Sequence, residues 1–334
     1  MAGPESRRSC RRAGSALAVM LVASSAGAFD IQGHRGARGL APENTLAGFR
    51  VALGIGVSTL ELDTGITRDG VVVVAHDRAL NPATTRDAAG RWLATAGPTL
   101  RSLSHAELLG FDVGRLDPAS KYAARYPEQR AVDGEVIPRL ADVLALGRLP
   151  GAEHLRFNIE TKLDPRAPDE TAPAEAFADR VVEVIRASGL ATRATVQSFD
   201  WRTLRRVDAV APEIETACLT VEQRWLDNVE RGRPGASAWT AGLDVDDHGG
   251  SVPALVAAAG CEVWSPHHQM VDAASLADAH ARGLRVVPWT VNEAERMRAL
   301  IELGVDGLIS DYPDRLREVV AAAGLALPPA VSAR

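Results

Sequence analysis

The chain has 334 residues, of which 46% are hydrophobic and 24% charged, so it holds enough apolar material for a large core and is not disordered. Its 37 basic and 43 acidic residues give a formal charge of −6, and the basic residues form no cluster that could follow a phosphate backbone. We therefore expect no nucleic-acid partner. Only two basic residues are lysines, Lys121 and Lys162, which makes a lysine at a functional position notable.

Residues 1–28 have the features of a secretory signal peptide. Four arginines precede an apolar stretch over Ser15–Ala23, and Ala26-Gly27-Ala28 forms an A-x-A cleavage motif. A membrane anchor is the alternative, but the stretch is shorter than the roughly 20 residues that span a bilayer. We predict an exported protein, periplasmic or secreted, with no stable membrane insertion after cleavage. An oxidising compartment could pair Cys218 with Cys261, or both could be buried thiols.

The rest of the chain alternates between strand and helix patterns. Apolar or β-branched runs predict eight strands at Phe29–Gln32, Thr59–Leu62, Leu155–Ile159, Ala194–Gln197, Ile214–Leu219, Cys261–Trp264, Arg285–Pro288 and Gly307–Ile309. Helical periodicity predicts helices at Asn44–Leu53, Leu140–Leu149, Ala174–Ser188, Trp201–Val210, Val252–Ala259, Ala273–Arg282, Glu293–Leu303 and Asp314–Ala323. Eight such units predict an α/β fold, a (β/α)8 TIM barrel, as one domain over residues 29–334. The alternative, a doubly wound open sheet, lacks a G-x-G-x-x-G turn after the first strand.

Two segments are longer than the loops of a barrel require. One is an insertion at about residues 78–138, after a strand that ends at His76, and the other runs from Val221 to Gly250. Because both follow strands, we expect them to lie over the face where barrel enzymes carry their active sites.

Polar residues follow the first two predicted strands. His34 and Arg35 come after the first strand, between glycines that would let a substrate approach the backbone; a capped surface loop is the alternative. Glu61 and Asp63 end the second strand, and their spacing of two places both carboxylates on the same face. Two carboxylates so close repel each other unless a proton or a cation lies between them, which indicates a hard divalent cation.

A β-hairpin follows, with Asp69-Gly70 at its turn. If the loop has two residues and the ladder is unbroken, Asp63 lies opposite His76. This register would bring a second histidine to the acidic face. A bulge at Gly65 would shift it by one residue, and a surface hairpin with a solvent-facing histidine is the alternative.

The third predicted barrel strand ends in a further acid and a lysine. Glu160 and Lys162 share a face of that strand, at the same rim as Glu61 and Asp63. A third inward carboxylate can complete a site for a hard cation, and a compact ammonium suits a phosphate oxygen. A structural ion pair between Glu160 and Lys162 is the alternative.

Later strands add candidates at the same rim. These are Gln197, Ser198 and Phe199 after the fourth strand, His267 and His268 after the sixth, Trp289 after the seventh, and Asp311 after the eighth. We select Gln197, Phe199 and Trp289 as candidate substrate-binding residues. Trp289 could form an apolar wall, although a tryptophan near a strand end is as often part of the core.

Two histidines, three carboxylates, an arginine and a lysine at one rim suit phosphodiester chemistry. A cation together with Arg35 would bind nonbridging oxygens and stabilise the charge that develops in the transition state. One imidazole would take a proton from the nucleophile, while the other would protonate the leaving alkoxide. This division predicts a bell-shaped dependence of rate on pH.

These residues and their neighbours resemble the motifs of the glycerophosphodiester phosphodiesterase family. In family order, the matching motifs are His34-Arg35-Gly36, Pro42-Glu43-Asn44-Thr45, Glu61-Leu62-Asp63, Thr67-Arg68-Asp69-Gly70, Val74-Ala75-His76-Asp77, Glu160-Thr161-Lys162 and Gly307-Leu308-Ile309-Ser310-Asp311. The resemblance runs from about Gly33 to Pro313. It implies a TIM barrel with an insertion after the His76 strand. It also implies hydrolysis of a small-molecule glycerophosphodiester to glycerol 3-phosphate and an alcohol.

The resemblance also implies roles for individual residues. They are His34 and His76 as the acid and base, Glu61, Asp63 and Glu160 as metal ligands, and Arg35 and Lys162 at the phosphate. Exported members that resemble this chain use calcium and others commonly use magnesium, so we expect a divalent cation, with calcium favoured. The two long segments match no family pattern, which leaves the alcohol group undetermined.

Two other functions remain open at this point. A phospholipase D-type enzyme acting on lysolipid or sphingolipid would share the histidines and carboxylates, but should carry an amphipathic surface segment. A noncatalytic phosphodiester-binding protein would be favoured if a histidine or carboxylate were missing, and all are present. Whether water attacks phosphorus directly or a glycerol hydroxyl attacks first is also open.

Overall fold

The computed structural model describes residues 1, 3 and 28–332. The signal peptide predicted over residues 1–28 falls mainly on residues 4–27, which lie outside the described residues. The leader and the division of the chain into leader and barrel domain therefore stay predictions. In the described part of the chain, no helix is long and apolar enough to cross a membrane.

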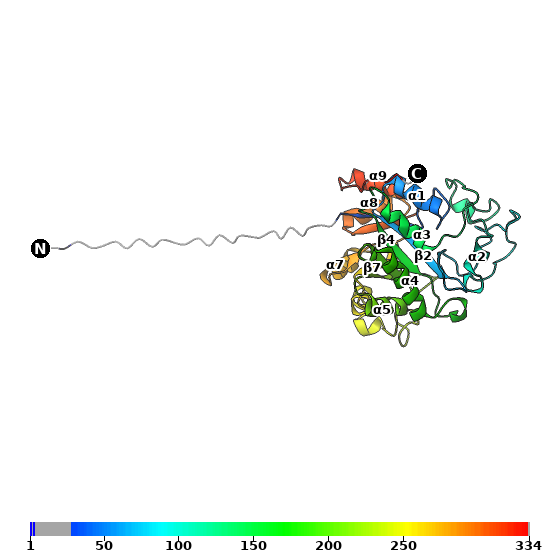
Figure 1. Ribbon diagram of the computed structural model, residues 1–334. Coiled ribbons are helices and arrows are strands. Elements are labelled where there is room, and N and C mark those ends of the chain that lie inside the picture. Colours follow the sequence, from blue (N-terminus) through cyan, green and yellow to red (C-terminus); the bar gives the residue numbers. More distant parts are fainter. Residues whose placement is uncertain (2, 4–27, 333–334) are drawn as a thin grey trace.

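Eight parallel strands form a nearly closed barrel, with helices around it (Figure 1). The strands are β1 (Asp30–Gly33), β2 (Thr59–Ile66), β4 (Arg156–Thr161), β5 (Ala194–Ser198), β6 (Glu215–Thr220), β7 (Val263–Pro266), β8 (Arg285–Val286) and β9 (Gly307–Ser310). They follow the order β8-β7-β6-β5-β4-β2-β1-β9. Asp306 N donates to Val286 O and Ile309 N to Pro288 O, both at 3.0 Å, which links the two ends of the sheet. The barrel prediction is confirmed, and the open sheet is wrong.

Most helices begin and end close to the predicted positions. The helices are α1 (Leu46–Ile55), α2 (His105–Leu108), α3 (Leu140–Leu144), α4 (Ala174–Ser188), α5 (Trp201–Val210), α6 (Val252–Ala258), α7 (Ala273–Ala281), α8 (Ala294–Leu303) and α9 (Pro313–Ala322). Helix α2 was not predicted, and α3 ends at Leu144, before the predicted Leu149, where a 3-10 turn follows. Short 3-10 turns lie at Leu100–Ser102, Ala123–Arg125, Ala145–Arg148, Pro168–Glu170, Ala191–Arg193, Asp246–His248 and His268–Met270. Several N-termini are capped by polar side chains; Thr45 and Asp200 accept backbone N–H groups at the starts of α1 and α5.

The pleat of the strands separates an apolar core from a polar barrel interior. On β2, Leu60 and Leu62 join the main hydrophobic core between sheet and helices, while Glu61 and Asp63 are buried on the other face. Successive side chains of a strand point to opposite faces, so this alternation directs both carboxylates into the barrel.

The hairpin register differs from the prediction by one residue. β2 pairs with antiparallel β3 (Val72–Val74), and Ala75 N donates to Asp63 O at 3.0 Å, so Asp63 lies opposite Ala75 rather than His76. The reason is a loop of three residues, 68–70, whose last residue, Gly70, has a φ of 80°. Glycine adopts this left-handed conformation without strain, and the extra loop residue shifts every pair by one.

The insertion between β3 and α3 packs beside the carboxyl end of β2 (Figure 1). Its buried residues Leu80, Leu100, Leu108 and Ile137 form a small hydrophobic core together with Val73 of β3. Hydrogen bonds tie the insertion to the loop after β1: Arg130 N donates to Leu40 O at 2.9 Å, and Gln129 Nε2 to Arg38 O at 2.7 Å. It therefore lies against the loop that carries His34.

A disulfide joins the strands β6 and β7. It pairs Cys218 of β6 with Cys261, which precedes β7, across a Cα to Cα distance of 5.9 Å. Both cysteines are buried, as the alternative of two buried thiols required, but the structure pairs them in a disulfide.

Candidate active site

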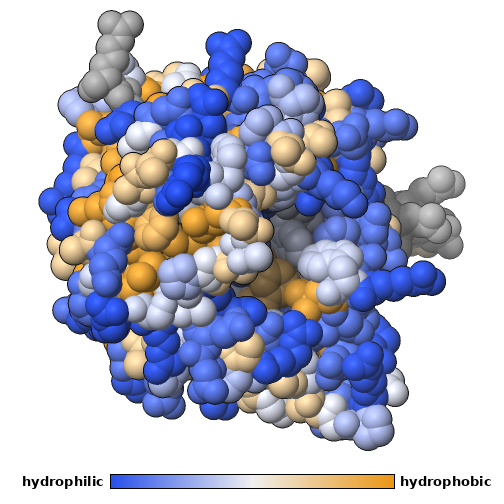
Figure 2. Space-filling model, turned by 90° about the vertical axis from the view of Figure 1, so that its right-hand side faces the viewer, coloured by the Kyte–Doolittle hydropathy of each residue, from blue (hydrophilic) through white to orange (hydrophobic). Residues whose placement is uncertain are grey.

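A cleft of about 1050 Å³ opens over the carboxyl ends of the strands. Figure 2 views the molecule from the side on which the insertion lies, and the surface there is hollowed near its middle. Arg35, His76, Glu160, Lys162, Phe199 and Trp289 all line the cleft. The fold thus brings residues from Arg35 to Asp311, 276 positions apart in the chain, to one opening.

The loop after β1 has a tightly folded backbone. Arg35 and Asn44 have φ values of 50° and 56°, left-handed conformations that cost a non-glycine residue on the order of 1–3 kcal/mol. A Cβ on Gly36 would lie 2.8 Å from the backbone of Gly48, so this position requires glycine. The fold lets Arg35 N donate to Glu61 Oε2 at 2.8 Å, which joins the loop to the end of β2.

Three buried carboxylates lie together at the carboxyl ends of β2 and β4, and one of them, Glu160, lines the cleft. Glu61, Asp63 and Glu160 each offer an oxygen within 4.8 Å of the others. Asp63 Oδ1 is buried and has no hydrogen-bond partner among the described residues. This all-oxygen donor set, with a free lone pair, fits a divalent cation.

The charges of this cluster act strongly on one another. Burial and the charge of Asp63 raise the pKa of Glu61 well above its usual range. Burial and Asp63 also raise the pKa of Glu160 to about 7, although Lys162 opposes this. Burial disfavours ionised Asp63, yet Arg35 and Lys162 hold the pKa of its carboxyl well below the usual range. A bound cation would relieve the repulsion that raises the first two pKa values.

Neighbouring side chains orient the three carboxylates. Gln197 Nε2 donates to Glu61 Oε1 at 2.8 Å, and Asn44 Nδ2 donates to Asp63 Oδ2 at 2.9 Å. Gln197, a predicted substrate-binding residue, is buried and does not line the cleft, so its contacts indicate that it positions Glu61. Asn44 was missed as a site residue, although the Pro42-Glu43-Asn44-Thr45 motif contains it.

Arg35 and Lys162 place positive charge beside the cluster. Arg35 Nε lies 3.1 Å from Asp63 Oδ2, and its Nη1 lies 2.7 Å from Glu43 Oε1. Lys162 Nζ lies 2.8 Å from Glu160 Oε1, so the ion pair considered from the sequence exists. Both cations line the cleft, where an anionic phosphodiester can reach them.

His34 lies between an aspartate and the acidic cluster. Its Nδ1 is 2.6 Å from Asp311 Oδ1, and its Nε2 is 3.9 Å from Glu61 Oε2. Burial and the charge of Arg38 lower the pKa of His34 to about 4, so the imidazole is neutral at pH 7. Because the Asp311 carboxylate accepts a hydrogen bond from Nδ1–H, Nε2 is the unprotonated atom of the neutral ring.

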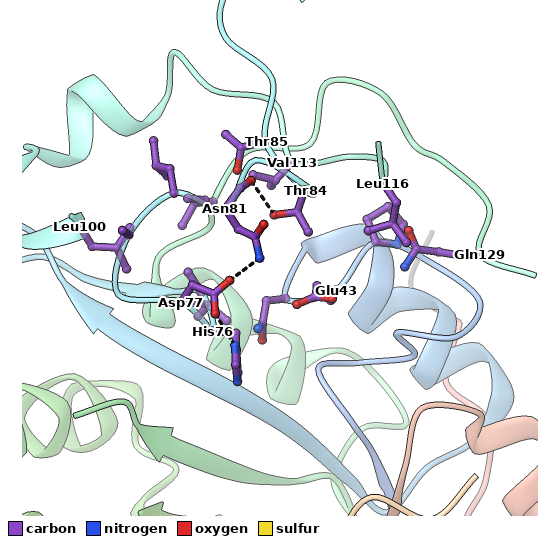
Figure 3. Close-up of a pocket in the computed structure, with 17 residues that line it drawn as sticks. Glu43, His76, Asp77, Asn81, Thr84, Thr85, Leu100, Val113, Leu116 and Gln129 are labelled. Carbon is purple, nitrogen blue, oxygen red and sulfur yellow. Dashed lines mark hydrogen bonds and ion pairs between the residues drawn. The ribbon is translucent and has the colours of Figure 1, made fainter. Parts of the chain in front are cut away.

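His76 is held in the same way by the residue that follows it. Its Nδ1 lies 2.7 Å from Asp77 Oδ1, and Asn81 Nδ2 donates to Asp77 Oδ2 at 2.6 Å (Figure 3). Behind them is a small pocket of about 50 Å³ between insertion and barrel. Burial and the charge of Arg35 lower the pKa of His76. His76 lines the cleft despite the one-residue shift in the hairpin register. The regular pairing of β2 with β3 ends at Val74, so His76 lies beyond the paired residues.

Tyr122 reaches the site from the insertion and was missed by sequence reasoning. Its hydroxyl donates to Glu43 and accepts a hydrogen bond from Arg38 Nη1 at 3.3 Å. Glu43 pairs with Arg35, and Arg38 pairs with Asp311, so the Tyr122 hydroxyl connects a group beside Arg35 with a group beside His34. No signal predicts this contact, because Tyr122 lies in a segment without periodicity or a known motif.

Five aromatic rings line one side of the cleft, and we call them the aromatic wall. They are Phe199, Trp225, Trp239, His267 and Trp289. The ring centroids of Phe199 and Trp289 are 5.4 Å apart, and those of His267 and Trp289 are 5.3 Å apart. The candidates Phe199, His267 and Trp289 are therefore neighbours. Trp225 and Trp239 come from the 221–250 segment, and no sequence pattern marked them.

Comparisons with known proteins agree with this site. The chain matches the model of the glycerophosphoryl diester phosphodiesterase family over residues 34–315. The solved structure of a candidate glycerophosphoryl diester phosphodiesterase from Silicibacter pomeroyi DSS-3 is 34% identical, with a TM-score of 0.79, over 90% of this chain and 95% of that one. The glycerophosphodiester phosphodiesterase of Caldanaerobacter subterraneus subsp. tengcongensis is 25% identical over 87% of this chain and 97% of its own.

A further solved structure shares the fold and contains a product. It is a phosphodiesterase from Oleispira antarctica in complex with sn-glycerol-3-phosphate, with a TM-score of 0.61 and 22% identity. The match covers 88% of this chain and 97% of that one. At this identity the likeness establishes the common barrel.

Proposed function

The chain belongs to the glycerophosphoryl diester phosphodiesterase family and is a phosphoric diester hydrolase, and from this premise we propose how it acts. It hydrolyses glycerophosphodiesters to glycerol 3-phosphate and an alcohol, with a bound divalent cation and with His34 and His76 as acid and base. One observation carries the proposal. Two histidines, each hydrogen-bonded to an aspartate through Nδ1, lie beside the three buried carboxylates of Glu61, Asp63 and Glu160. The product found in the Oleispira antarctica relative supports the assignment of glycerol 3-phosphate.

Glu61, Asp63 and Glu160 would hold the cation. A bound cation would place positive charge beside the nonbridging phosphoryl oxygens and would stabilise the negative charge that develops on them. Calcium accepts irregular sets of carboxylates, whereas magnesium demands near-octahedral geometry and keeps several waters. This difference favours calcium at three carboxylates that are already constrained by protein hydrogen bonds.

The two histidines handle the protons. The Nδ1 of His34 is hydrogen-bonded to Asp311, and the Nδ1 of His76 is hydrogen-bonded to Asp77. Each imidazole therefore presents Nε2 for reaction. One Nε2 takes a proton from the nucleophile, and the other donates a proton to the leaving alkoxide. Where a glycerol hydroxyl is the nucleophile, water then opens the cyclic phosphate to give glycerol 3-phosphate. The pKa values of His34 and His76 are both lowered in the free protein. The negative charge of a bound diester raises the pKa of the histidine that serves as the acid.

Arg35 and Lys162 bind the phosphate. Their ion pairs with Asp63 and Glu160 hold both cations in place before substrate arrives, so little reorganisation is needed. Charge on the nonbridging oxygens increases in the transition state, and two fixed cations stabilise it more than they stabilise the ground state.

We also propose that the protein is exported to the periplasm or secreted. The leader pattern of residues 1–28 supports this location. The disulfide between Cys218 and Cys261 supports it too, because such bonds persist in oxidising compartments.

The decisive test is release of glycerol 3-phosphate from glycerophosphocholine by the purified protein. The assay is run with calcium, with magnesium and with a chelator. Release that the chelator stops and calcium restores is the expected result. If glycerophosphodiesters yield no product under any condition while lysolipid is cleaved, the protein acts on lipid and the proposal is wrong.

A further inference from the structure

The 221–250 segment places a tryptophan at the cleft that the chemistry above does not use. The Trp225 side chain is 63% exposed and lines the cleft. Its ring is nearly perpendicular to Trp289, at 75° and 6.3 Å, and to His267, at 73° and 6.1 Å. A large exposed indole beside an active site is typical of a surface that contacts a ligand.

The aromatic wall begins at the phosphate-binding residues and leads away from them. Lys162 Nζ lies 5.9 Å from the centroid of the Phe199 ring. Phe199 contacts Trp289, and Trp289 in turn contacts Trp225. A group esterified to a phosphate at Lys162 would therefore extend along these rings.

The exposed faces of the wall are suited to a cation. Aromatic faces carry partial negative charge, and Arg166 already lies 5.1 Å from the centroid of Trp239. In the described part of the chain, no lysine or arginine lies over Trp225 or Trp289. The Nε1 of Trp289 is occupied, because it donates to Ser265 O at 3.0 Å. Burial lowers the pKa of His267, so this ring is neutral at pH 7 and does not repel a cation.

From this arrangement we infer that Trp289 and Trp225, next to Phe199, form a subsite for a cationic alcohol group of the substrate, of the quaternary ammonium class to which choline belongs. A trimethylammonium group has no hydrogen-bond donor and is bound by aromatic faces, whereas a glycerol group needs polar partners. The inference rests on the proposed function, since the subsite is defined by the phosphate position.

The test compares two substrates that differ only in the alcohol. We measure kcat/KM for glycerophosphocholine and for glycerophosphoglycerol with the wild type, Trp225→Ala and Trp225→Phe. Trp225→Ala should lower the value for the choline diester about 3- to 30-fold, the range of a cation–π contact. The glycerol diester should change by less than about twofold, as for other surface substitutions. Trp225→Phe keeps an aromatic face and should retain most of the preference.

Trp92→Ala is the matched control, because Trp92 stacks on Arg86 in the insertion and does not line the cleft. It should leave the ratio of the two kcat/KM values unchanged. A binding measurement complements the kinetics: tetramethylammonium should inhibit the wild type, and its inhibition constant should rise about 3- to 30-fold in Trp225→Ala. Inhibition by glycerol 3-phosphate should be the same in both proteins.

The failures of the two proposals are distinguishable. If the wild type hydrolyses neither diester, the proposed function is wrong. If it hydrolyses both and Trp225→Ala lowers both equally or neither, the cationic subsite is wrong. We also measure kcat/KM for lysophosphatidylglycerol, which carries an acyl chain. If Trp225→Ala lowers this value and spares that for glycerophosphocholine, the wall binds an acyl chain, which also overturns the inference.

Discussion

The floor of the cleft is made of strand ends, whereas two long segments contribute much of its walls. The floor carries Glu61, Asp63 and Glu160, all buried and all held by hydrogen bonds or ion pairs. The walls combine residues of the insertion after β3 and of the 221–250 segment with rings that follow β5, β7 and β8, and they present exposed rings such as Trp225.

This difference separates the chemistry from the choice of substrate. Buried charges must be held by partners, so a floor residue can change little without losing its function. A loop residue that is largely exposed can change at small cost in stability. Substitutions on the floor should therefore affect every diester alike, while substitutions on the aromatic wall should affect some diesters more than others.

The strongest test of the floor is His76→Ala. Loss of one proton-transfer group should lower kcat about 10²- to 10⁴-fold for choline and glycerol diesters alike. Steady-state kinetics on both substrates measures this. His280→Ala is the control, since His280 pairs with Asp306 on the surface, away from the cleft. An unchanged rate in His76→Ala would remove His76 from the mechanism.

Removal of the cation should be nearly as damaging. A chelator, or Glu160→Gln, should lower kcat about 10²- to 10³-fold, because charge stabilisation in the transition state is lost. Calcium should also raise the Tm of the wild type, since it binds only the folded cluster, and should not raise that of Glu160→Gln. Thermal unfolding with and without calcium checks this separately from activity. A Tm insensitive to calcium in the wild type would argue against the site.

The framework of the barrel should affect stability without affecting specificity. Replacing both Cys218 and Cys261 by serine opens a crosslink between residues 43 positions apart, which should lower the free energy of unfolding by about 2–4 kcal/mol. Urea unfolding measures this loss. At temperatures where the variant is folded, the ratio of kcat/KM for the two diesters should stay constant, and a changed ratio would connect the disulfide to the aromatic wall.

Tyr122→Phe gives the smallest expected effect. It tests whether Tyr122, which comes from the insertion, acts on all diesters alike or on some more than others. Tyr122 belongs to a wall but bonds to Glu43 and Arg38, so its loss should act through the floor. We expect kcat/KM to fall about tenfold for both diesters equally, from the loss of hydrogen bonds to charged groups. Tyr126→Phe is the matched control, because the buried Tyr126 hydroxyl has no partner among the described residues. A substrate-dependent loss in Tyr122→Phe would instead place this residue with the specificity-determining wall.

The floor was largely predictable, because local patterns determine it. The alternation on β2 places Glu61 and Asp63 on one face, and that rule is independent of the rest of the chain. Local patterns were not sufficient for the hairpin. Its loop has three residues, with Gly70 in the left-handed conformation, so the predicted register was wrong by one residue. Turn geometry depends on backbone angles that the residue pair Asp69-Gly70 does not settle by itself.

The sequence by itself determined the barrel, the rim residues of its strands and the family, since periodicity and short motifs are local properties of the chain. Only the tertiary structure decided that Tyr122 reaches Glu43, that Gln197 supports Glu61 rather than facing the cleft, and that Trp225 adjoins Trp289. These contacts join segments far apart in the chain. They depend on how long loops fold over the strand ends, where no repeating pattern restricts the backbone.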